Sequence, residues 1–288
     1  MIIKRSLCAF FALLLLLGTA FAQQPLTENA LPVDFSAGVQ PDPAGYTGEL
    51  CYSDPTLTIT VEAGRQDDCD FWVADIRIGH PSQLRTAAAD GFESDMVLPA
   101  AAIARRMNAV LAVNGDYFNY NKNGYTLRQG ELFKDRLNGR RDLLLIDEDG
   151  DFHFMRKARK GTGVTEINGK KVINAFSFGP VLVENGELNQ DYSCDEMAFG
   201  DYCQRMCIGQ VDKLHYKIVC CAAPHRGSEG MTIRQFASLV HSLGIPNAYN
   251  LDGGNSTMLI FNGEKINDAD NPKERDIADI IYFASAAE

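Results

Sequence analysis

The sequence lacks an excess of positive charge and, beyond residue 22, any long apolar run. Its 288 residues carry 27 Lys and Arg against 38 Asp and Glu, which gives a formal net charge of −11. So acidic a chain is a poor general ligand for nucleic acid or anionic membranes, and we expect no nucleic-acid partner. Without an apolar run of about 20 residues, we expect no membrane span after signal cleavage.

Two familiar catalytic arrangements are also missing. The five histidines are scattered along the chain and predict no metal cluster. No Gly-x-Ser-x-Gly segment is present, so a Ser-His-Asp triad is not indicated. Asp147-Glu148-Asp149-Gly150-Asp151 has its glycine too early for an EF-hand calcium loop, and a solvated hairpin turn is the better interpretation. These absences leave carboxylates and arginines as the candidates for chemistry.

Residues 1–22 have the pattern of a secretory signal peptide. Lys4 and Arg5 precede the apolar run Leu7–Leu17, and Ala20-Phe21-Ala22 forms a small-x-small cleavage signal. No cysteine follows the cut directly, so a lipoprotein anchor is not indicated. We therefore expect a secreted protein, extracellular or periplasmic.

Seven cysteines remain after Cys8 leaves with the signal peptide. They are Cys51, Cys69, Cys194, Cys203, Cys207, Cys220 and Cys221. Disulfides are the expected state outside the cell, and Cys51 with Cys69 and one pair among Cys194, Cys203 and Cys207 are the candidates. Because the number is odd, at least one thiol is free, buried or shared with another chain.

The chain is organised as a leader followed by one domain. Residues 23–50 are rich in Pro, Gly, Ala and polar residues and are interpreted as a loosely ordered leader, and 51–288 as a single catalytic-type domain. β-branched and aromatic residues predict strands at 56–61 and 71–78. Asn-Gly pairs at 168–169, 185–186 and 262–263 predict hairpins, because both residues accept positive φ.

Two helices are predicted, at about 99–108 and from a capping box at Thr232 and Gln235 to Gly244. Each is followed by a buried strand, a carboxylate and a glycine: Asn114-Gly115-Asp116 in one case and Asn250-Leu251-Asp252-Gly253 in the other. Together with the hairpins, this pattern predicts a mixed α/β (α+β) fold, in which a mixed β-sheet is flanked by helices.

The segment Asn250–Met258, NLDGGNSTM, carries the strongest local signal for a site. Gly253 and Gly254 allow backbone N–H groups to approach a ligand, and successive N–H groups can form an anion-binding nest. Asn255, Ser256 and Thr257 add side-chain donors, and Asp252 could orient a sugar hydroxyl, hold water or transfer a proton. The alternative is a well-capped turn between two core strands. Asn255-Ser256-Thr257 also fits a glycosylation sequon, but a buried glycine loop is a poor acceptor.

The sequence resembles the phosphodiester glycosidase family between about residues 71 and 283. The resembling segments, in chain order, are WVADIRIGHPSQLRTAAA, NAVLAVNGDYF, GYTLRQGEL, RMCIGQ, GMTIRQFASLVHSLGIPNAYNLDGGNSTMLIFNG and RDIADIIYF. Many relatives read DGGGS where this chain reads DGGNS, and many have Asp-Gly-Arg where it has CCAAPHRGSEGMT. The resemblance implies hydrolysis of the bond between a sugar's anomeric carbon and a phosphodiester, on a cell-wall, capsular or exopolysaccharide-type substrate.

The resemblance also implies roles for named residues. Asp116 and Asp252 are the expected catalytic carboxylates, one as base or cation stabiliser and one as a sugar ligand, with the assignment open. Arg205 is the first candidate for binding the phosphate, against a surface ion pair, and Arg128 the second, against a hairpin-surface charge. The expected substrate-binding residues are Asn114, Gly115, Arg128, Arg226, Gly253, Gly254, Asn255, Ser256 and Thr257.

Two other functions fit the same residues. The chain could be a glycan- or phosphoglycan-binding module without turnover, or a phosphodiesterase that cleaves P–O rather than C–O. No cofactor is required and no metal site is predicted, although Asp116 and Asp252 offer oxygen ligands for a divalent cation.

Overall fold

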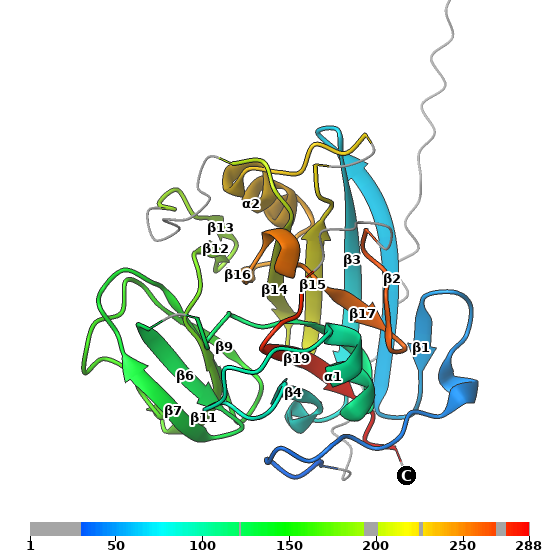
Figure 1. Cartoon of the computed structure of the whole chain (residues 1–288), viewed down its shortest axis with the longest axis horizontal. Helices are drawn as coiled ribbons and strands as arrows, with labels where there is room; N and C mark the ends of the chain where they lie inside the picture. Colours follow the sequence, from blue (N-terminus) through cyan, green and yellow to red (C-terminus); the bar gives the residue numbers. More distant parts are fainter. Residues whose placement is uncertain (1–29, 121, 193–200, 225–226, 269–274, 288) are drawn as a thin grey trace, which may run out of the picture.

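The fold is built mainly from antiparallel strands (Figure 1). The structure, a computed structural model, describes residues 30–287 except 121, 193–200, 225–226 and 269–274. Within these residues there are nineteen strands and only two α-helices, and every strand pair is antiparallel. The predicted α/β class is therefore wrong. The helices are short, and the Asn-Gly turns join strands as hairpins, whereas parallel strands need long crossovers.

The strands form three sheets. In spatial order, the largest contains β1 (Cys51–Ser53), β2 (Leu57–Gln66), β3 (Cys69–Ile78), β15 (His215–Cys221), β14 (Arg205–Asp212), β16 (Asn247–Asn250), β12 (Val181–Glu184) and β13 (Glu187–Leu188). The second contains β18 (Glu264–Lys265), β17 (Leu259–Phe261), β5 (Ala109–Asn114), β19 (Asp279–Ala284) and β4 (Leu84–Ala88). The third contains β7 (Glu131–Arg136), β6 (Gly124–Arg128), β11 (Lys170–Phe176), β8 (Leu143–Asp147) and β9 (Phe152–Met155), with β10 (Glu166–Ile167) beside β11.

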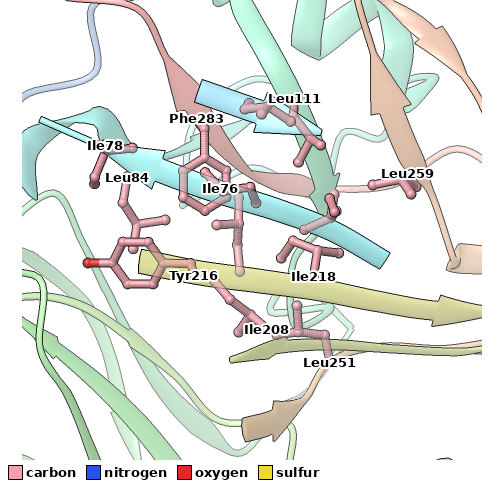
Figure 2. Close-up of a cluster of buried hydrophobic side chains, with 14 of the residues drawn as sticks. Ile76, Ile78, Leu84, Leu111, Ile208, Tyr216, Ile218, Leu251, Leu259 and Phe283 are labelled. Atoms are coloured by element: carbon pink, nitrogen blue, oxygen red, sulfur yellow. The ribbon is translucent and has the colours of Figure 1, made fainter. Parts of the chain in front are cut away.

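The main core lies between the first two sheets. Figure 2 shows side chains from both of them meeting in one cluster: Ile76 and Ile218 come from the first sheet, and Leu111, Leu259 and Phe283 from the second. Each is fully or almost fully buried. Burying a side chain of this size contributes about 1.5–3 kcal/mol, so this layer holds the two sheets in a fixed relation. The third sheet forms the lobe at the lower left of Figure 1 and has its own smaller core.

The two helices cover the outer faces of the first two sheets. α2 (Ile233–Ser242) begins at the predicted capping box, in which Thr232 and Gln235 bond each other's backbone N–H groups. Its buried residues pack on the first sheet, whereas α1 (Ala100–Arg106) packs on the second. The predicted hairpins at the three Asn-Gly pairs are confirmed, because all six residues have positive φ and connect paired strands.

Part of the predicted leader contacts the domain, at residues 32–36. The guanidinium of Arg85, which is fully buried, donates to the backbone oxygens of Pro32, Asp34 and Ser36 and pairs with the Asp34 carboxylate at 3.2 Å. A 3₁₀ turn, η1 (Pro43–Gly45), follows. A buried arginine needs such acceptors, and the leader's backbone supplies them. The predicted signal peptide lies outside the described residues. Among the residues that are described, no helix is long and apolar enough to cross a membrane.

The predicted Cys51–Cys69 disulfide is not formed. Cys51 lies opposite Thr60, and Thr60 lies opposite Asp75, six residues along β3 from Cys69. At about 3.3 Å per residue this separates the two cysteines by roughly 20 Å, far beyond the reach of a disulfide. Cys207 is a free, buried thiol in this structure, and Cys194 lies outside the described residues, so a pair among Cys194, Cys203 and Cys207 stays a prediction.

Candidate active site

The two predicted helix–strand–acid segments converge. Asn114, at the end of β5, donates from Nδ2 to the backbone oxygen of Asp252 at 2.8 Å and accepts at Oδ1 from the Met258 N–H at 3.1 Å. The Asp252 N–H also approaches the Gly115 oxygen at 3.4 Å. Asn114 therefore joins the two loops from a position 1 % exposed. Because its amide is engaged with backbone groups, its predicted contact with a sugar stays a prediction.

A buried charge cluster lies directly beside this junction. Arg128, at the end of β6, pairs through Nη2 with Asp116 Oδ1 at 2.7 Å and with Asp279 Oδ2 at 3.4 Å. The other Asp116 oxygen accepts the Ser177 N–H at 2.8 Å. All three charged side chains are at most 2 % exposed. Arg128 is therefore an internal countercharge for two carboxylates, and the surface-charge alternative for it is wrong.

Aromatic rings and backbone carbonyls fix the Arg128 guanidinium. It lies over the Phe176 ring, 4.1 Å from the centroid, and 5.5 Å from that of Phe92. Nη1 donates to the backbone oxygens of Ala175 and Leu127, while Nε is buried with no hydrogen-bond partner among the described residues. Cation–π contact and charge-assisted hydrogen bonds together hold the guanidinium plane in one orientation.

Asp279 is a site residue that the sequence reasoning did not single out. It begins β19 within IADIIYF, and an acid inside so apolar a run was the available signal. Gly115 is matched to it, because a Cβ at Gly115 would overlap all three carboxylate atoms of Asp279. Burial raises the pKa of Asp279 to about 7, opposed by Arg128 and reinforced by the negative charge of Asp116.

Asp252 is the most exposed of the three site carboxylates, at 8 %, against 1 % for Asp116 and 2 % for Asp279. Burial raises its pKa to about 6, while hydrogen bonding to Ser256, the charge of Arg275 and the Gly253 N–H act in the opposite direction. The Gly253 N–H donates to Oδ1 at 2.9 Å. A carboxyl group with a pKa of about 6 exchanges protons readily near neutral pH, which is the property required of a general acid or base.

The glycine loop needs its small residues for packing. A Cβ at Gly253 would lie 2.7 Å from the Gln204 backbone oxygen, and Gly254, whose N–H donates to that oxygen, has φ +58°. Gly254 begins the 3₁₀ turn η3 (Gly254–Ser256). Asn255, which replaces the glycine of many relatives, is exposed and is not among the residues of positive φ. The substitution is therefore compatible with the local backbone.

Two further hydroxyl groups belong to this loop. Ser256 is buried beside Asp252, and the Thr257 Oγ1 is buried with no hydrogen-bond partner within the described chain. A buried hydroxyl without a partner is costly, at about 1–3 kcal/mol, unless water or a ligand completes it. Of the two, Thr257 therefore has hydrogen-bonding capacity to offer.

The cleft at these residues is small. It is lined by Asn114, Gly115, Tyr117, Asp252, Ser256, Asp276, Ile277, Ala278 and Asp279, and its volume is about 10 Å³. That is room for one water molecule. Tyr117, which has φ +61°, stacks on Tyr120 and lies 5.6 Å below the guanidinium of Arg275. Binding of a sugar ring therefore requires this aromatic and cationic rim to move.

Of the two remaining predicted arginines, Arg205 is not part of the charge cluster and Arg226 is not among the described residues. Arg205, at the start of β14, is 4 % exposed and donates to the backbone oxygens of Met231 at 3.1 Å and Asp201 at 2.9 Å. Its backbone is adjacent to Gly253. Arg226 lies outside the described residues. Contact of either side chain with phosphate stays a prediction, whereas Arg275, which the sequence reasoning did not name, is placed at the cleft.

No metal site is apparent among the described residues. No group of three or more His, Cys, Asp and Glu side chains there has an arrangement that would hold a metal ion. Arg128 occupies the space between Asp116 and Asp279 where a cation would neutralise them. Binding of a divalent cation by Asp116 and Asp252 stays a prediction.

Comparison with known proteins gives the family. A family model for phosphodiester glycosidase matches residues 107–284, which include both carboxylate loops and Asp279. The chain belongs to the phosphodiester glycosidase family, as its sequence motifs predicted. No curated protein matches it in a sequence search.

Solved structures share the fold. One is the catalytic domain of zebrafish N-acetylglucosamine-1-phosphodiester α-N-acetylglucosaminidase, auto-inhibited by its propeptide, with TM-score 0.63 and 15 % identity over 81 % of this chain and 85 % of that one. Another, from Synechocystis, has TM-score 0.58 and 15 % identity over 79 % and 62 % of the two chains. A third, from Burkholderia pseudomallei K96243, has TM-score 0.55 and 15 % identity over 75 % and 74 %.

Proposed function

We propose that this protein hydrolyses the bond between the anomeric carbon of a sugar and a phosphodiester, and that Asp252 is its general base. The observation that carries the proposal is the position of Asp252, which lines the cleft with a pKa raised to about 6 and lies beside the Asp116–Arg128–Asp279 cluster. Phosphate is a fair leaving group, so activation of water matters more than protonation of the leaving oxygen. A carboxylate serves that task when it is ionised.

The fixed charges support a division of roles. Both oxygens of Asp116 accept hydrogen bonds, so Asp116 supplies stationary negative charge to an oxocarbenium-like transition state. Preorganised charge of this kind costs no reorganisation during the reaction. Arg275 at the rim is the first candidate donor for the phosphate, because the N–H groups of Gly253 and Gly254 already donate to Asp252 and Gln204. Arg205 remains the second candidate for that role.

Export and a polymeric substrate complete the proposal. The N-terminal pattern of charge, apolar run and small residues supports passage through a secretory pathway, and the related Burkholderia structure is described as an exported protein. A secreted enzyme of this class meets sugar-1-phosphodiesters in cell-wall, capsular or exopolysaccharide material. The zebrafish relative, named for an N-acetylglucosamine phosphodiester, makes that sugar the first to test.

The deciding assay is hydrolysis of UDP-N-acetylglucosamine by folded variants. In this soluble compound the α-anomeric oxygen is bonded to the diphosphate of UDP, so cleavage of the C–O bond releases UDP. We expect Asp252→Asn to lower kcat by about 100-fold or more, the scale of a lost general base. Arg275→Ala and Arg205→Ala separate the two phosphate candidates, since the true ligand raises KM when removed. Arg65→Ala, an exposed arginine on the β2–β3 hairpin, is the matched control and should leave both constants unchanged.

Isotope labelling distinguishes the alternatives. In ¹⁸O-water, C–O cleavage places the label in the released sugar, whereas a P–O phosphodiesterase places it in the phosphate. A glycan-binding module without catalysis gives saturable binding and no product from any α-sugar phosphodiester tested. Either of these results would withdraw the glycosidase proposal for this chain.

A further inference from the structure

Two buried cysteines meet on the face of the large sheet that α2 covers. Cys69 begins β3 and Cys221 ends β15, and both are 0 % exposed. Cys221 lies opposite Phe71, so Cys69 is two residues further along β3 on the same face. Such diagonal neighbours on paired strands are about 7–8 Å apart at Cα and somewhat closer at Cβ, and both thiols are free in this structure, so a disulfide would draw the two strand ends slightly together. The backbone therefore brings two thiols together from distant parts of the sequence.

The side chains use this proximity. The Cys221 thiol donates a hydrogen bond to the sulfur of Cys69, which also accepts from the Ser228 hydroxyl at 3.4 Å. These bonds lower the pKa of Cys69 to about 7, whereas burial raises that of Cys221. A thiolate is the reactive species in thiol–disulfide exchange. Cys69 is consequently the better nucleophile of the pair.

We propose that Cys69 and Cys221 form the structural disulfide of the exported protein, in place of the Cys51–Cys69 pair that the sequence suggested. Its oxidant is a thiol–disulfide oxidoreductase of the compartment into which the chain is exported. The Cys69 thiolate attacks the oxidant's disulfide and releases one of its sulfurs as a thiolate. Cys221, once deprotonated, attacks Cys69 in the mixed disulfide and releases the second. Overall, the two protein thiols become one disulfide and the oxidant's disulfide becomes two thiols. Two hydrogen atoms pass from the protein to the oxidant.

The crosslink would hold the start of the segment that follows β15 and ends beside Arg205. Cys221 is directly followed by Ala222, whose N–H donates to the Asp70 oxygen at 2.8 Å. The segment from Ala222 then runs to Met231, whose oxygen accepts from Arg205. Arg205 lies opposite Cys221 in the β14–β15 ladder. A bond between Cys69 and Cys221 would therefore hold β3 to β15 at the residue where this segment begins.

Peptide mapping tests the proposal without any assay of activity. The full chain is expressed with its predicted signal peptide so that it is exported into an oxidising compartment. It is then alkylated in denaturant without reductant, and digested. We expect one linked pair of peptides that contains Cys69 and Cys221 and is two hydrogen atoms lighter than their sum. Cys207 and Cys220 should be alkylated and so serve as internal controls. Alkylation of both Cys69 and Cys221, or linkage of either to another cysteine, overturns the proposal.

Stability measurements on alanine variants provide the second readout. Cys69→Ala, Cys221→Ala and the double variant should lose a similar amount of Tm, on the order of 5–10 °C, because each removes the same crosslink. Cys220→Ala is the matched control, because Cys220 is a buried cysteine on the opposite face of β15. Peptide mapping of this variant should still find the linked Cys69–Cys221 pair. Additive losses in the double variant would mean that the two side chains act only as separate packing groups.

Discussion

Gly115→Ala is the smallest change that should disturb the charge cluster. The added methyl group would overlap the carboxylate of Asp279, which must turn away from Arg128. The backbone itself is not the obstacle, because Gly115 does not have a positive φ. Overpacking of this kind costs about 1–3 kcal/mol, and weakening a buried ion pair adds to that cost. We expect a loss of roughly 2–4 kcal/mol in the free energy of unfolding, taken from those same ranges.

A double-mutant cycle isolates the cause. Asp279→Ala removes the atoms that the methyl group would meet, while Asp279→Asn keeps their shape and removes only the charge. Gly115→Ala should therefore cost less than about 1 kcal/mol in the Asp279→Ala background and its full amount in the Asp279→Asn background. Neither single substitution at Asp279 should unfold the protein, since Arg128 keeps its 2.7 Å pair with Asp116.

Urea unfolding followed by the fluorescence of the single tryptophan, Trp72, measures each corner of the cycle. Trp72 packs against the main core, so its signal reports global unfolding. Equal costs of Gly115→Ala in all three backgrounds would refute the steric argument. Rescue by Asp279→Asn would instead show that the methyl group acts through charge.

Two further predictions concern the same junction. Arg128→Leu should lower the free energy of unfolding by about 3–5 kcal/mol at neutral pH, because Asp116 and Asp279 lose their countercharge. Arg128→Lys should lower it less, and the difference between the two variants should shrink in acid. Urea unfolding at neutral and acidic pH measures both effects. Asn114→Ala should cost about 1–3 kcal/mol through unsatisfied backbone groups and should lower kcat more than it raises KM, since the Asp252 loop loses its clamp.

Local structure was readable from the sequence where the signal is local. The capping box at Thr232, the hairpins at the Asn-Gly pairs and the two acidic loops each depend on a few adjacent residues, and the structure contains all of them. The fold class was not readable in this way. Helix followed by strand resembles an α/β repeat, and only the partner of each strand, which lies far away in sequence, shows that the sheets are antiparallel.

Residues of the candidate site could likewise be named from the sequence only where the signal is local. Asp116 and Asp252 could be named because each lies just after a buried strand and next to a glycine, Gly115 in one case and Gly253 in the other. Asp279 and the internal role of Arg128 could not, because their significance comes from three strands meeting: β6, β19 and the end of β5. The glycine at position 115 is part of the same arrangement, since a Cβ there would overlap the Asp279 carboxylate.

Asp252 should act on activity and on stability in opposite directions as pH changes. Its pKa in the folded protein is raised from 3.8 to about 6, so the folded state binds the proton more tightly than the unfolded chain does. The stability from this group is full below about pH 4 and is lost as pH rises to about 6, with a change on the order of 3 kcal/mol for two pKa units. Asp252→Asn should match the wild type in acid and exceed its stability at pH 8.

The rate should change in the other direction, because a general base works only when ionised. We expect kcat/KM for UDP-N-acetylglucosamine to rise through about pH 6, over the same interval in which Asp252 ceases to stabilise the fold. Urea unfolding of wild type and Asp252→Asn across this range, together with the wild-type pH–rate profile, tests both slopes. A rate that falls above pH 6 would make Asp252 the proton donor instead. A stability difference that does not vary with pH would mean that burial does not shift this carboxyl group at all.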